Sequence, residues 1–247
     1  MRENSKKILL FLFPSSGEPA WLTFAQLSQL VPKLSRAGLL STLFLLDKKD
    51  LLRIDKTQAE WRYSLSSHGV SQLKALFPAL SMENRPRQSD WVLLVFLNSP
   101  KSDQNFRYLR NYLSQNRSIA LTRAVYLLPR PLVAQVMPEL EKSYRNSVMV
   151  VEIGRWLFGD DFKIIGQKAG LHDLFELYSS ISKEIDRLIE IKTTNKAFTQ
   201  QENLDFFSAL DRFLGLLAQD TALISLYFPD VISPLELLAR LQKLLKI

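Results

Sequence analysis

The fold class is decided by the segment Asp90–Gly154, in which apolar runs of strand length alternate with helical stretches. The apolar runs are WVLLVFLNSP (Trp91–Pro100), AVYLLPR (Ala124–Arg130) and SVMVVEIG (Ser147–Gly154). The helical stretches between them are QNFRYLRNYLSQN (Gln104–Asn116) and PLVAQVMPELEK (Pro131–Lys142). This order, with room for one more strand around Arg117–Thr122, predicts a small ferredoxin-like α+β sandwich. The chain on either side is predicted to form separate modules.

The segment before the sandwich, residues 1–81, is predicted to fold as a winged helix-turn-helix. Helical spacing of apolar residues predicts three helices, at Lys6–Phe13, after the capping box of Thr23 and Gln26, and at Arg36–Lys49. Two short runs of β character predict a hairpin, LLRIDK (Leu51–Lys56) and EWRYSL (Glu60–Leu65). A last helix is expected at His68–Phe77. Three helices, a hairpin and a helix in this order are typical of a winged helix-turn-helix.

The segment after the sandwich, residues 161–247, is predicted to be a helical domain. Its amphipathic stretches are Leu171–Ile191, Gln200–Gln219 and Pro234–Lys246. None of these helices can bury its apolar stripe alone, so they must pack on one another or on a partner chain. The stretch RWLFGDDFKIIG is predicted to be irregular, with Asp160 and Asp161 as charges at a helix start. The polar segment 82–89 is predicted to link the first domain to the central one, residues 90–160.

The positive charge of the chain is unevenly distributed. The formal net charge is +7, and residues 1–85 carry 12 Lys and Arg against 7 Asp and Glu. Residues 86–160 carry 10 against 6, and residues 161–247 carry 10 against 12. A basic excess in the first two modules is typical of proteins that bind polyanions, above all nucleic-acid phosphates. Ordinary solubility charge is the alternative explanation for a net charge of this size.

Several functional classes find no support in the composition. The chain has no cysteine, which excludes disulfides and thiolate chemistry and fits a cytoplasmic location. No uncharged apolar run reaches about 18 residues, so no membrane partner is expected. The two histidines, His68 and His172, belong to no metal-binding motif, and no glycine-rich phosphate loop is present. The sequence therefore predicts a protein that is not an enzyme and has no metal and no cofactor.

Five loose motifs spread over the chain carry a resemblance to a known family. They are LFLLDKKDLL (Leu43–Leu52), WRYSLSSHG (Trp61–Gly69), DWVLLVFLNSP (Asp90–Pro100), FRYLRNYL (Phe106–Leu113) with AVYLLPR, and YFPDVISPLELLARL (Tyr227–Leu241). These motifs and the order of the modules resemble the phenylacetate-degradation repressor (PaaX) family. The resemblance implies a homodimeric transcriptional repressor that binds double-stranded DNA. It also implies a small effector of the acyl-CoA type and a central domain similar to the small CRISPR-associated nucleases.

Candidate DNA-binding residues lie on the third predicted helix and on the hairpin. They are Arg36, Ser41, Phe44, Lys48, Lys49, Arg53, Lys56 and Arg62. Arginine can bond guanine with two N–H groups, serine can bond a base or a phosphate, and phenylalanine can pack on a thymine methyl group. The hairpin cations are predicted to contact phosphates or the minor groove. A further cluster, Arg107, Arg110, Arg117 and Arg123, could contact DNA or pair with the acidic C-terminal segment.

Two departures from the family pattern keep other functions open. Leu40 and Leu45 stand where the family has arginines in its reading helix, so that helix could instead be an apolar docking face for a protein. Leu97 or Asn98 stands where related nucleases have an aspartate that binds metal, which argues against the third alternative, a metal-dependent nuclease.

Overall fold

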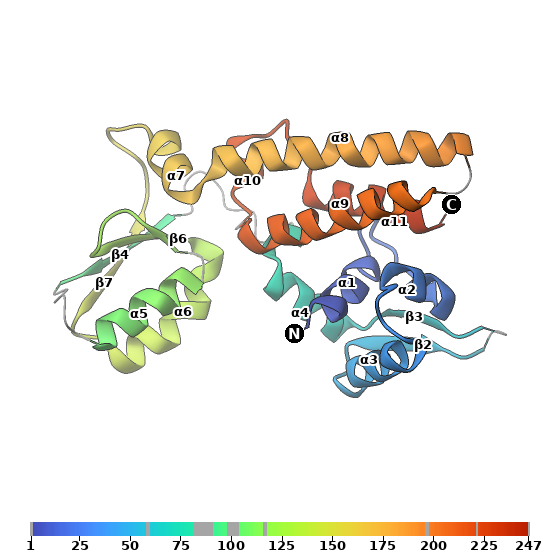
Figure 1. Ribbon diagram of the computed structural model, residues 1–247. Coiled ribbons are helices and arrows are strands. Elements are labelled where there is room, and N and C mark those ends of the chain that lie inside the picture. Colours follow the sequence, from blue (N-terminus) through green and yellow to red (C-terminus); the bar gives the residue numbers. More distant parts are fainter. Residues whose placement is uncertain are drawn as a thin grey trace. The chain divides into compact units, whose positions relative to one another are not determined.

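The computed structural model describes residues 2–57, 60–81, 91–97, 104–115, 118–195, 198–220 and 222–246. It is a mixed α/β structure with a three-stranded and a four-stranded antiparallel sheet (Figure 1). The chain divides into two compact units. Unit 1 comprises Met1–Ser81, Leu177–Asp220 and Ile232–Ile247, and unit 2 comprises Met82–Glu176 and Thr221–Val231. The segment predicted as a third domain, residues 161–247, is thus divided between the two units.

The first part of unit 1 contains the elements predicted for residues 1–81 and one additional strand. In order they are α1 (Glu3–Phe11), β1 (Leu22–Thr23), α2 (Phe24–Leu30), α3 (Arg36–Lys48), β2 (Leu52–Asp55), β3 (Arg62–Leu65), α4 (Ser67–Leu76) and a 3-10 turn at Pro78–Leu80. β2 and β3 form the predicted antiparallel hairpin. The unpredicted strand β1 pairs with the other edge of β3, so the sheet order is β1-β3-β2.

Side-chain caps fix where these helices begin. The predicted capping box at the start of α2 is confirmed, because Thr23 accepts from the N–H of Gln26 and Gln26 accepts from the N–H of Thr23. At α4 the Ser66 hydroxyl accepts from the N–H of Gly69 at 2.9 Å and donates to the carbonyl of Asp50. A Cβ at Gly69 would lie 2.2 Å from the Leu51 carbonyl oxygen, so only glycine allows this close approach.

Helical spacing puts Ile8, Leu9 and Leu12 on one face, but the second half of α1 and the residues directly after it are buried on every side. Every residue from Ile8 to Phe13 is at most 2% exposed. Gln242, from the C-terminal helix α11 (Pro234–Lys246), donates its side-chain amide to the carbonyls of Phe11 and Phe13 at 2.9 and 2.8 Å. These bonds satisfy carbonyl groups at the end of α1 that have no partner within the helix.

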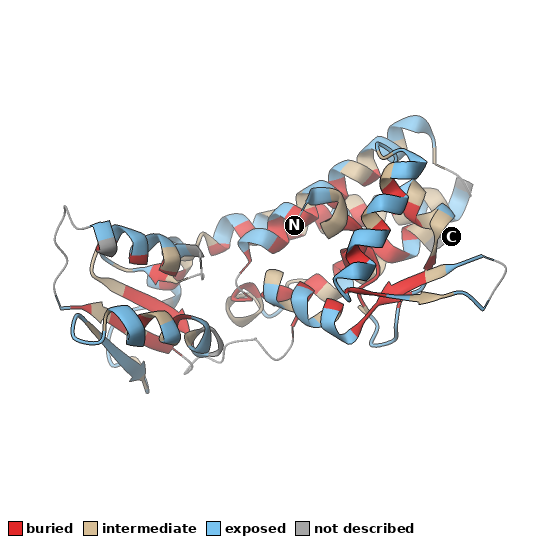
Figure 2. Ribbon diagram, turned by 90° about the horizontal axis from the view of Figure 1, so that it is seen from below, coloured by how far each residue is buried: buried red, intermediate tan, exposed pale blue. Residues whose placement is uncertain are grey.

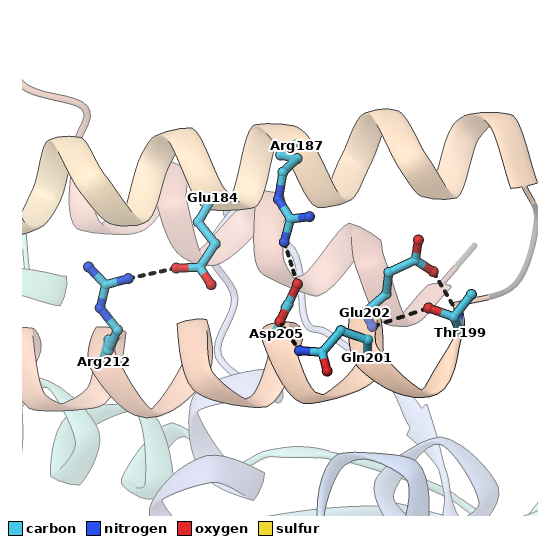
Figure 3. A network of polar contacts seen from close by, with 7 residues as sticks. All are labelled: Glu184, Arg187, Thr199, Gln201, Glu202, Asp205 and Arg212. Atoms are coloured by element: carbon cyan, nitrogen blue, oxygen red, sulfur yellow. Dashed lines mark hydrogen bonds and ion pairs between the residues drawn. The ribbon is translucent and has the colours of Figure 1, made fainter.

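The long C-terminal helices are held together by apolar stripes and by polar contacts. α8 (Leu171–Asn195) and α9 (Gln200–Gln219) are joined by Arg212–Glu184 at 2.7 Å and Arg187–Asp205 at 2.5 Å (Figure 3). Buried and exposed residues alternate along the helices with the helical repeat (Figure 2). Helical spacing predicts an apolar stripe on α9 made of Leu204, Phe207, Leu210, Leu214 and Leu217. Leu204 is nevertheless 57% exposed, because the buried face includes Phe206 and Phe213 instead.

Unit 2 contains the predicted alternation of strands and helices. Its elements are β4 (Trp91–Phe96), α5 (Gln104–Gln115), β5 (Ile119–Ala120), β6 (Val125–Pro129), α6 (Arg130–Ser143) and β7 (Val148–Ile153). The sheet order is β5-β6-β4-β7, and every neighbouring pair is antiparallel. Phe96, Leu109 and Tyr126 belong to the core between this sheet and the helices α5 and α6, which lie together below it in Figure 1.

Two helices of unit 2 were not predicted. The stretch expected to be irregular contains α7 (Asp161–Ala169), which begins at the cap Asp160, as the helix-start charge indicated. A short helix α10 (Ile224–Tyr227) follows α9 in the chain. The ring of Phe162 packs on those of Tyr227 and Phe228, each with centroids 5.6 Å apart. The predicted linker 82–89, Asn98 and Arg117 lie outside the described residues.

Candidate functional site

One face of α3 is exposed to solvent. Leu39, Leu43 and Leu46 are buried and orient the helix. The residues of the opposite side, called the α3 face below, are Arg36, Ala37, Leu40, Ser41, Phe44, Leu45 and Lys48, all exposed, and Asp47 of the same helix is exposed as well. Within this face Leu40, Phe44 and Leu45 are 48%, 65% and 51% exposed. The chain therefore leaves apolar and cationic side chains accessible on the same helix surface.

Cations stand at both ends of the α3 face. Arg36 begins the helix next to the cap Ser35, and its guanidinium lies 5.5 Å from the centroid of the Phe24 ring. Lys48 and Lys49 are exposed at the other end, where the helix dipole favours positive charge. No ion pair among the described residues engages any of these three cations. Their charge remains accessible to a polyanion.

The hairpin cations differ in how accessible they are. Arg53 is exposed on β2 and donates through Nη2 to the Ser67 hydroxyl at 3.1 Å. The Nζ of Lys56 lies 4.6 Å from the ring centroid of Trp61. Arg62 is half-buried on β3.

Arg62 has a carboxylate as its neighbour on the adjacent strand. It lies directly across the hairpin from Asp55. The pKa of Asp55 is lowered, first by hydrogen bonds from Thr57 and also by the charge of Arg62. Arg62 is therefore less available to an external ligand than Arg53 or Lys56.

Two arginines of unit 2 lie against the aromatic ring of Phe106. Arg110 and Arg123 hold their guanidinium groups 6.0 and 5.8 Å from the centroid of the Phe106 ring, and Arg110 Nε donates to the Tyr126 hydroxyl at 3.1 Å. Arg107 is exposed on α5. The structure thus brings Arg110 and Arg123 of the predicted cluster together at Phe106, and Arg107 and Arg110 are both exposed.

Two concave regions near the hairpin were missed by sequence reasoning. A groove of about 900 Å³ beside the end of α3 is lined by Arg2, Ser5, Thr42, Leu45, Leu46, Lys49, Leu51, His68 and Gln72. A smaller cleft of about 150 Å³ lies at the base of the hairpin. Both combine residues far apart in the sequence, so no local motif marks either of them.

The described residues provide neither a metal cluster nor a membrane span. Their side chains contain no group of three or more His, Cys, Asp or Glu able to hold a metal ion. Among the described helices none combines the length and the apolar character that crossing a bilayer requires.

Comparison with known proteins yields a likeness of fold. No family model matches the sequence, and no curated protein matches it. Among solved structures the chain is similar to the uncharacterized protein Rv0674 from Mycobacterium tuberculosis, with a TM-score of 0.51 and 16% sequence identity. The match covers 97% of each chain. At this level of identity the likeness concerns the fold alone.

Proposed function

We propose that the protein is a transcriptional regulator, a repressor of the PaaX type, that binds double-stranded DNA through its N-terminal segment. The observation that carries the proposal is the α3 face, which is exposed and has accessible cations at both ends, Arg36 at the start and Lys48 at the end. Helix-turn-helix proteins place such a helix in the major groove. A cytoplasmic location, which the absence of cysteine supports, and a small acyl-CoA-like effector, which the family resemblance implies, are part of the proposal.

The order of elements supports assigning a winged helix-turn-helix to residues 1–81. The helices α1, α2 and α3 are followed by the hairpin β2–β3 and by α4, and β1 completes the sheet. A ferredoxin-like sandwich is supported by the strand order β5-β6-β4-β7 and by the two helices α5 and α6 that connect its strands. The amphipathic helices α8, α9 and α11 would form the helical C-terminal part.

In this proposal each cation has a defined role. Arg36, in the first turn of α3, would reach guanine edges, because the N-terminal residues of a reading helix contact bases. Ser41 and Phe44 would contact bases farther along the groove. Lys48 and Lys49 would contact phosphates. On the hairpin, Arg53 and Lys56 would contact the flanking backbone, and Arg62 would contribute less because it faces Asp55.

The test measures DNA binding as a function of salt. The double variant Arg36→Gln/Lys48→Gln is compared with Lys183→Gln/Lys243→Gln, which removes two exposed lysines from α8 and α11. Fluorescence anisotropy with mixed duplex DNA, at salt concentrations between about 50 and 200 mM, gives the affinity. It also gives the salt slope, which is the steepness with which log affinity falls with log salt concentration. The slope should fall by about 0.9 for each phosphate that the variant no longer neutralises, and removal of a base contact should weaken binding roughly 10- to 100-fold. A wild-type chain that does not bind DNA at the lowest salt concentration would overturn the proposal.

A docking function is the second candidate, and the apolar part of the α3 face favours it. Leu40, Phe44 and Leu45 are about half exposed or more. Such a cluster on one helix is also what a protein partner would cover. Under this alternative Leu40→Ser/Leu45→Ser abolishes capture of the partner, whereas Arg36→Gln/Lys48→Gln barely changes it.

The proposal includes a homodimer, and the free edge of β7 supports that part. Among the described strands β7 pairs with β4 only, so it forms one end of the sheet. The N–H of Leu97 bonds the carbonyl of Ser147 at 3.0 Å, so odd-numbered residues of β7 bond to β4. The N–H and C=O groups of the even-numbered residues Val148, Val150 and Glu152 consequently point to the open edge.

This edge is complementary to a second copy of itself. Met149, Val150 and Val151 are 46%, 37% and 42% exposed, and β7 has no lysine or proline to block pairing. An antiparallel pair of β7 strands centred on Val150 places Met149 opposite Val151 of the second copy. It places Glu152 opposite Val148, so like charges do not meet. The twofold arrangement that results is the one expected of a dimer.

A further inference from the structure

The cleft at the base of the hairpin, called the hairpin-base cleft below, has a volume of about 150 Å³. Leu12, Pro14 and Val70 contribute to its apolar wall, and its polar lining includes Arg53, Ser64 and Ser67. A water molecule occupies roughly 30 Å³ of liquid, so the cleft has room for a small polyatomic ligand. An arginine and two hydroxyl groups beside an apolar wall are suited to a ligand with hydrogen-bond acceptors.

One buried hydroxyl in this cleft has no partner. Ser64 is 1% exposed, and its Oγ makes no hydrogen bond to any described part of the chain. Ser64 and Arg53 are directly opposite in the hairpin, so both side chains stand on the same face of the sheet, and both line the cleft. Buried polar groups are nearly always hydrogen-bonded, so the Ser64 hydroxyl is a donor that a ligand of the cleft could use.

The other polar groups of the cleft are hydrogen-bond donors. Arg53 bonds Ser67, and the ion pairs among the described residues do not include it. Ser67 begins α4, a helix of 10 residues. The cap Ser66 accepts from the N–H groups of Gly69 and Val70 at 2.9 and 3.0 Å, so two N–H groups of the first turn have no partner within the helix.

The nearby carboxylate does not compete for Arg53. Asp55 stands on the same face of β2 two residues farther along. Its Oδ1 accepts from the N–H and the hydroxyl of Thr57 at 2.9 and 2.6 Å. The guanidinium of Arg53 therefore keeps donors available for an acceptor in the cleft.

From these groups we propose that the hairpin-base cleft is a binding site for a tetrahedral oxyanion, a phosphate group. The guanidinium of Arg53 and the Ser67 hydroxyl bond its oxygens at the mouth, and the start of α4 supplies favourable N–H groups and a dipole. Ser64 donates its hydroxyl from the buried side of the cleft. The phosphate comes either from solution, free or as a monoester, or from a nucleic-acid backbone, in which case the site rests on the proposed function.

The first arm of the test uses inorganic phosphate without DNA. Thermal unfolding is followed in sodium phosphate and in sodium chloride of equal ionic strength. Phosphate at ten times its Kd should raise Tm by about 3–6 °C. Arg53→Gln should weaken the phosphate response roughly 10- to 100-fold, and the control Arg155→Gln, which removes an exposed arginine of unit 2, should leave it unchanged.

Ser64→Ala separates a ligand contact from a structural role. It should weaken the phosphate response roughly fivefold while leaving Tm in chloride unchanged or higher, because it removes a hydroxyl that lacks a protein partner. A lower Tm in chloride together with an unchanged phosphate response would overturn the site. So would a wild-type chain whose Tm is the same in phosphate and in chloride and whose DNA affinity is unchanged by Arg53→Gln.

The second arm adds duplex DNA and distinguishes the two sources. If the cleft takes a backbone phosphate, DNA abolishes the phosphate response and Arg53→Gln lowers the salt slope by about 0.9. If it takes a separate phosphate, the response persists in the complex and the slope stays the same. A chain that responds to phosphate and ignores DNA refutes the proposed function while supporting the site. The reverse case is a chain that binds DNA through the α3 face while Arg53→Gln changes neither the phosphate response nor the salt slope. That result supports the proposed function and refutes the site.

Discussion

Pairing of two β7 strands can be tested by a single cysteine, because the chain has none of its own. The perturbation is Val150→Cys, at the centre of the proposed strand pair. Val150 directs its N–H and C=O groups to the open edge, so it would form a hydrogen-bonded pair with Val150 of the second copy. The Cα atoms of such a pair lie about 5.5 Å apart, inside the range of about 4.4–6.8 Å that a disulfide requires.

The neighbouring position provides the matched control. Val151 has similar exposure, and in the same pairing it lies opposite Met149 of the second copy. The two Val151 Cα atoms are then separated by two residue steps along the strands and one strand spacing across, about 8 Å in total. That distance exceeds the reach of a disulfide. Val150→Cys should therefore form a covalent dimer under mild oxidation, and Val151→Cys should not.

Non-reducing electrophoresis and mass spectrometry measure the covalent dimer, and light scattering measures the oligomeric state of the wild-type chain. Val150→Pro removes an edge N–H that the sheet of its own chain does not use, so it should give a folded monomer. Equal cross-linking at both positions would refute the register. A wild-type chain that is monomeric at all concentrations would refute the strand pairing altogether.

Two further predictions concern polar groups buried in unit 1. Gln242→Leu should lower the free energy of unfolding by about 1–3 kcal/mol, because the carbonyl of Phe11 loses its partner and that of Phe13 keeps only the N–H of Ser15; the urea midpoint should fall at unchanged m-value. The Tyr178 hydroxyl donates to Asp220 at 2.6 Å, and its pKa is raised well above 10, first by burial and then by the carboxylate. Folded Tyr178 therefore keeps its proton at pH values at which the unfolded side chain loses it, so the free energy of unfolding falls as pH rises above 10. In Tyr178→Phe, urea unfolding should show a smaller fall over the same pH range.

The sequence predicted elements whose signals are local. The capping box at Thr23 and the period of apolar residues located α2 and α3 closely. Strand β1 has only two residues and exists because β3 lies beside it, so no periodicity could indicate it. α7 is different, because its signals were present. Asp160 caps its start, and Gly170 ends it in the left-handed conformation with φ of 63°.

The composition of the α3 face could also be predicted, whereas its accessibility could not. Helical spacing separates Leu39 and Leu43 from Leu40 and Phe44, but it does not say whether a second element covers the other side. In unit 1 the second half of α1 is covered on all sides, although helical spacing predicts one apolar face. The cleft around Ser64 is harder still, because an unpartnered hydroxyl is a property of three-dimensional packing and leaves no pattern in the sequence.

The surroundings of α1 decide which form of the protein suits a DNA-binding test. α1 packs against α2 and α4 of the N-terminal segment and also against α11 from the end of the chain. Lys7 forms ion pairs with Glu3 and with Asp211 of α9. Burial alone would lower the pKa of Lys7, but hydrogen bonds to these two carboxylates raise it. Residues 1–81 without the C-terminal helices would therefore expose an apolar helix and deprive Lys7 of its Asp211 partner. A failure of that fragment to bind DNA would report the loss of this packing, so only the full chain can decide what the α3 face does.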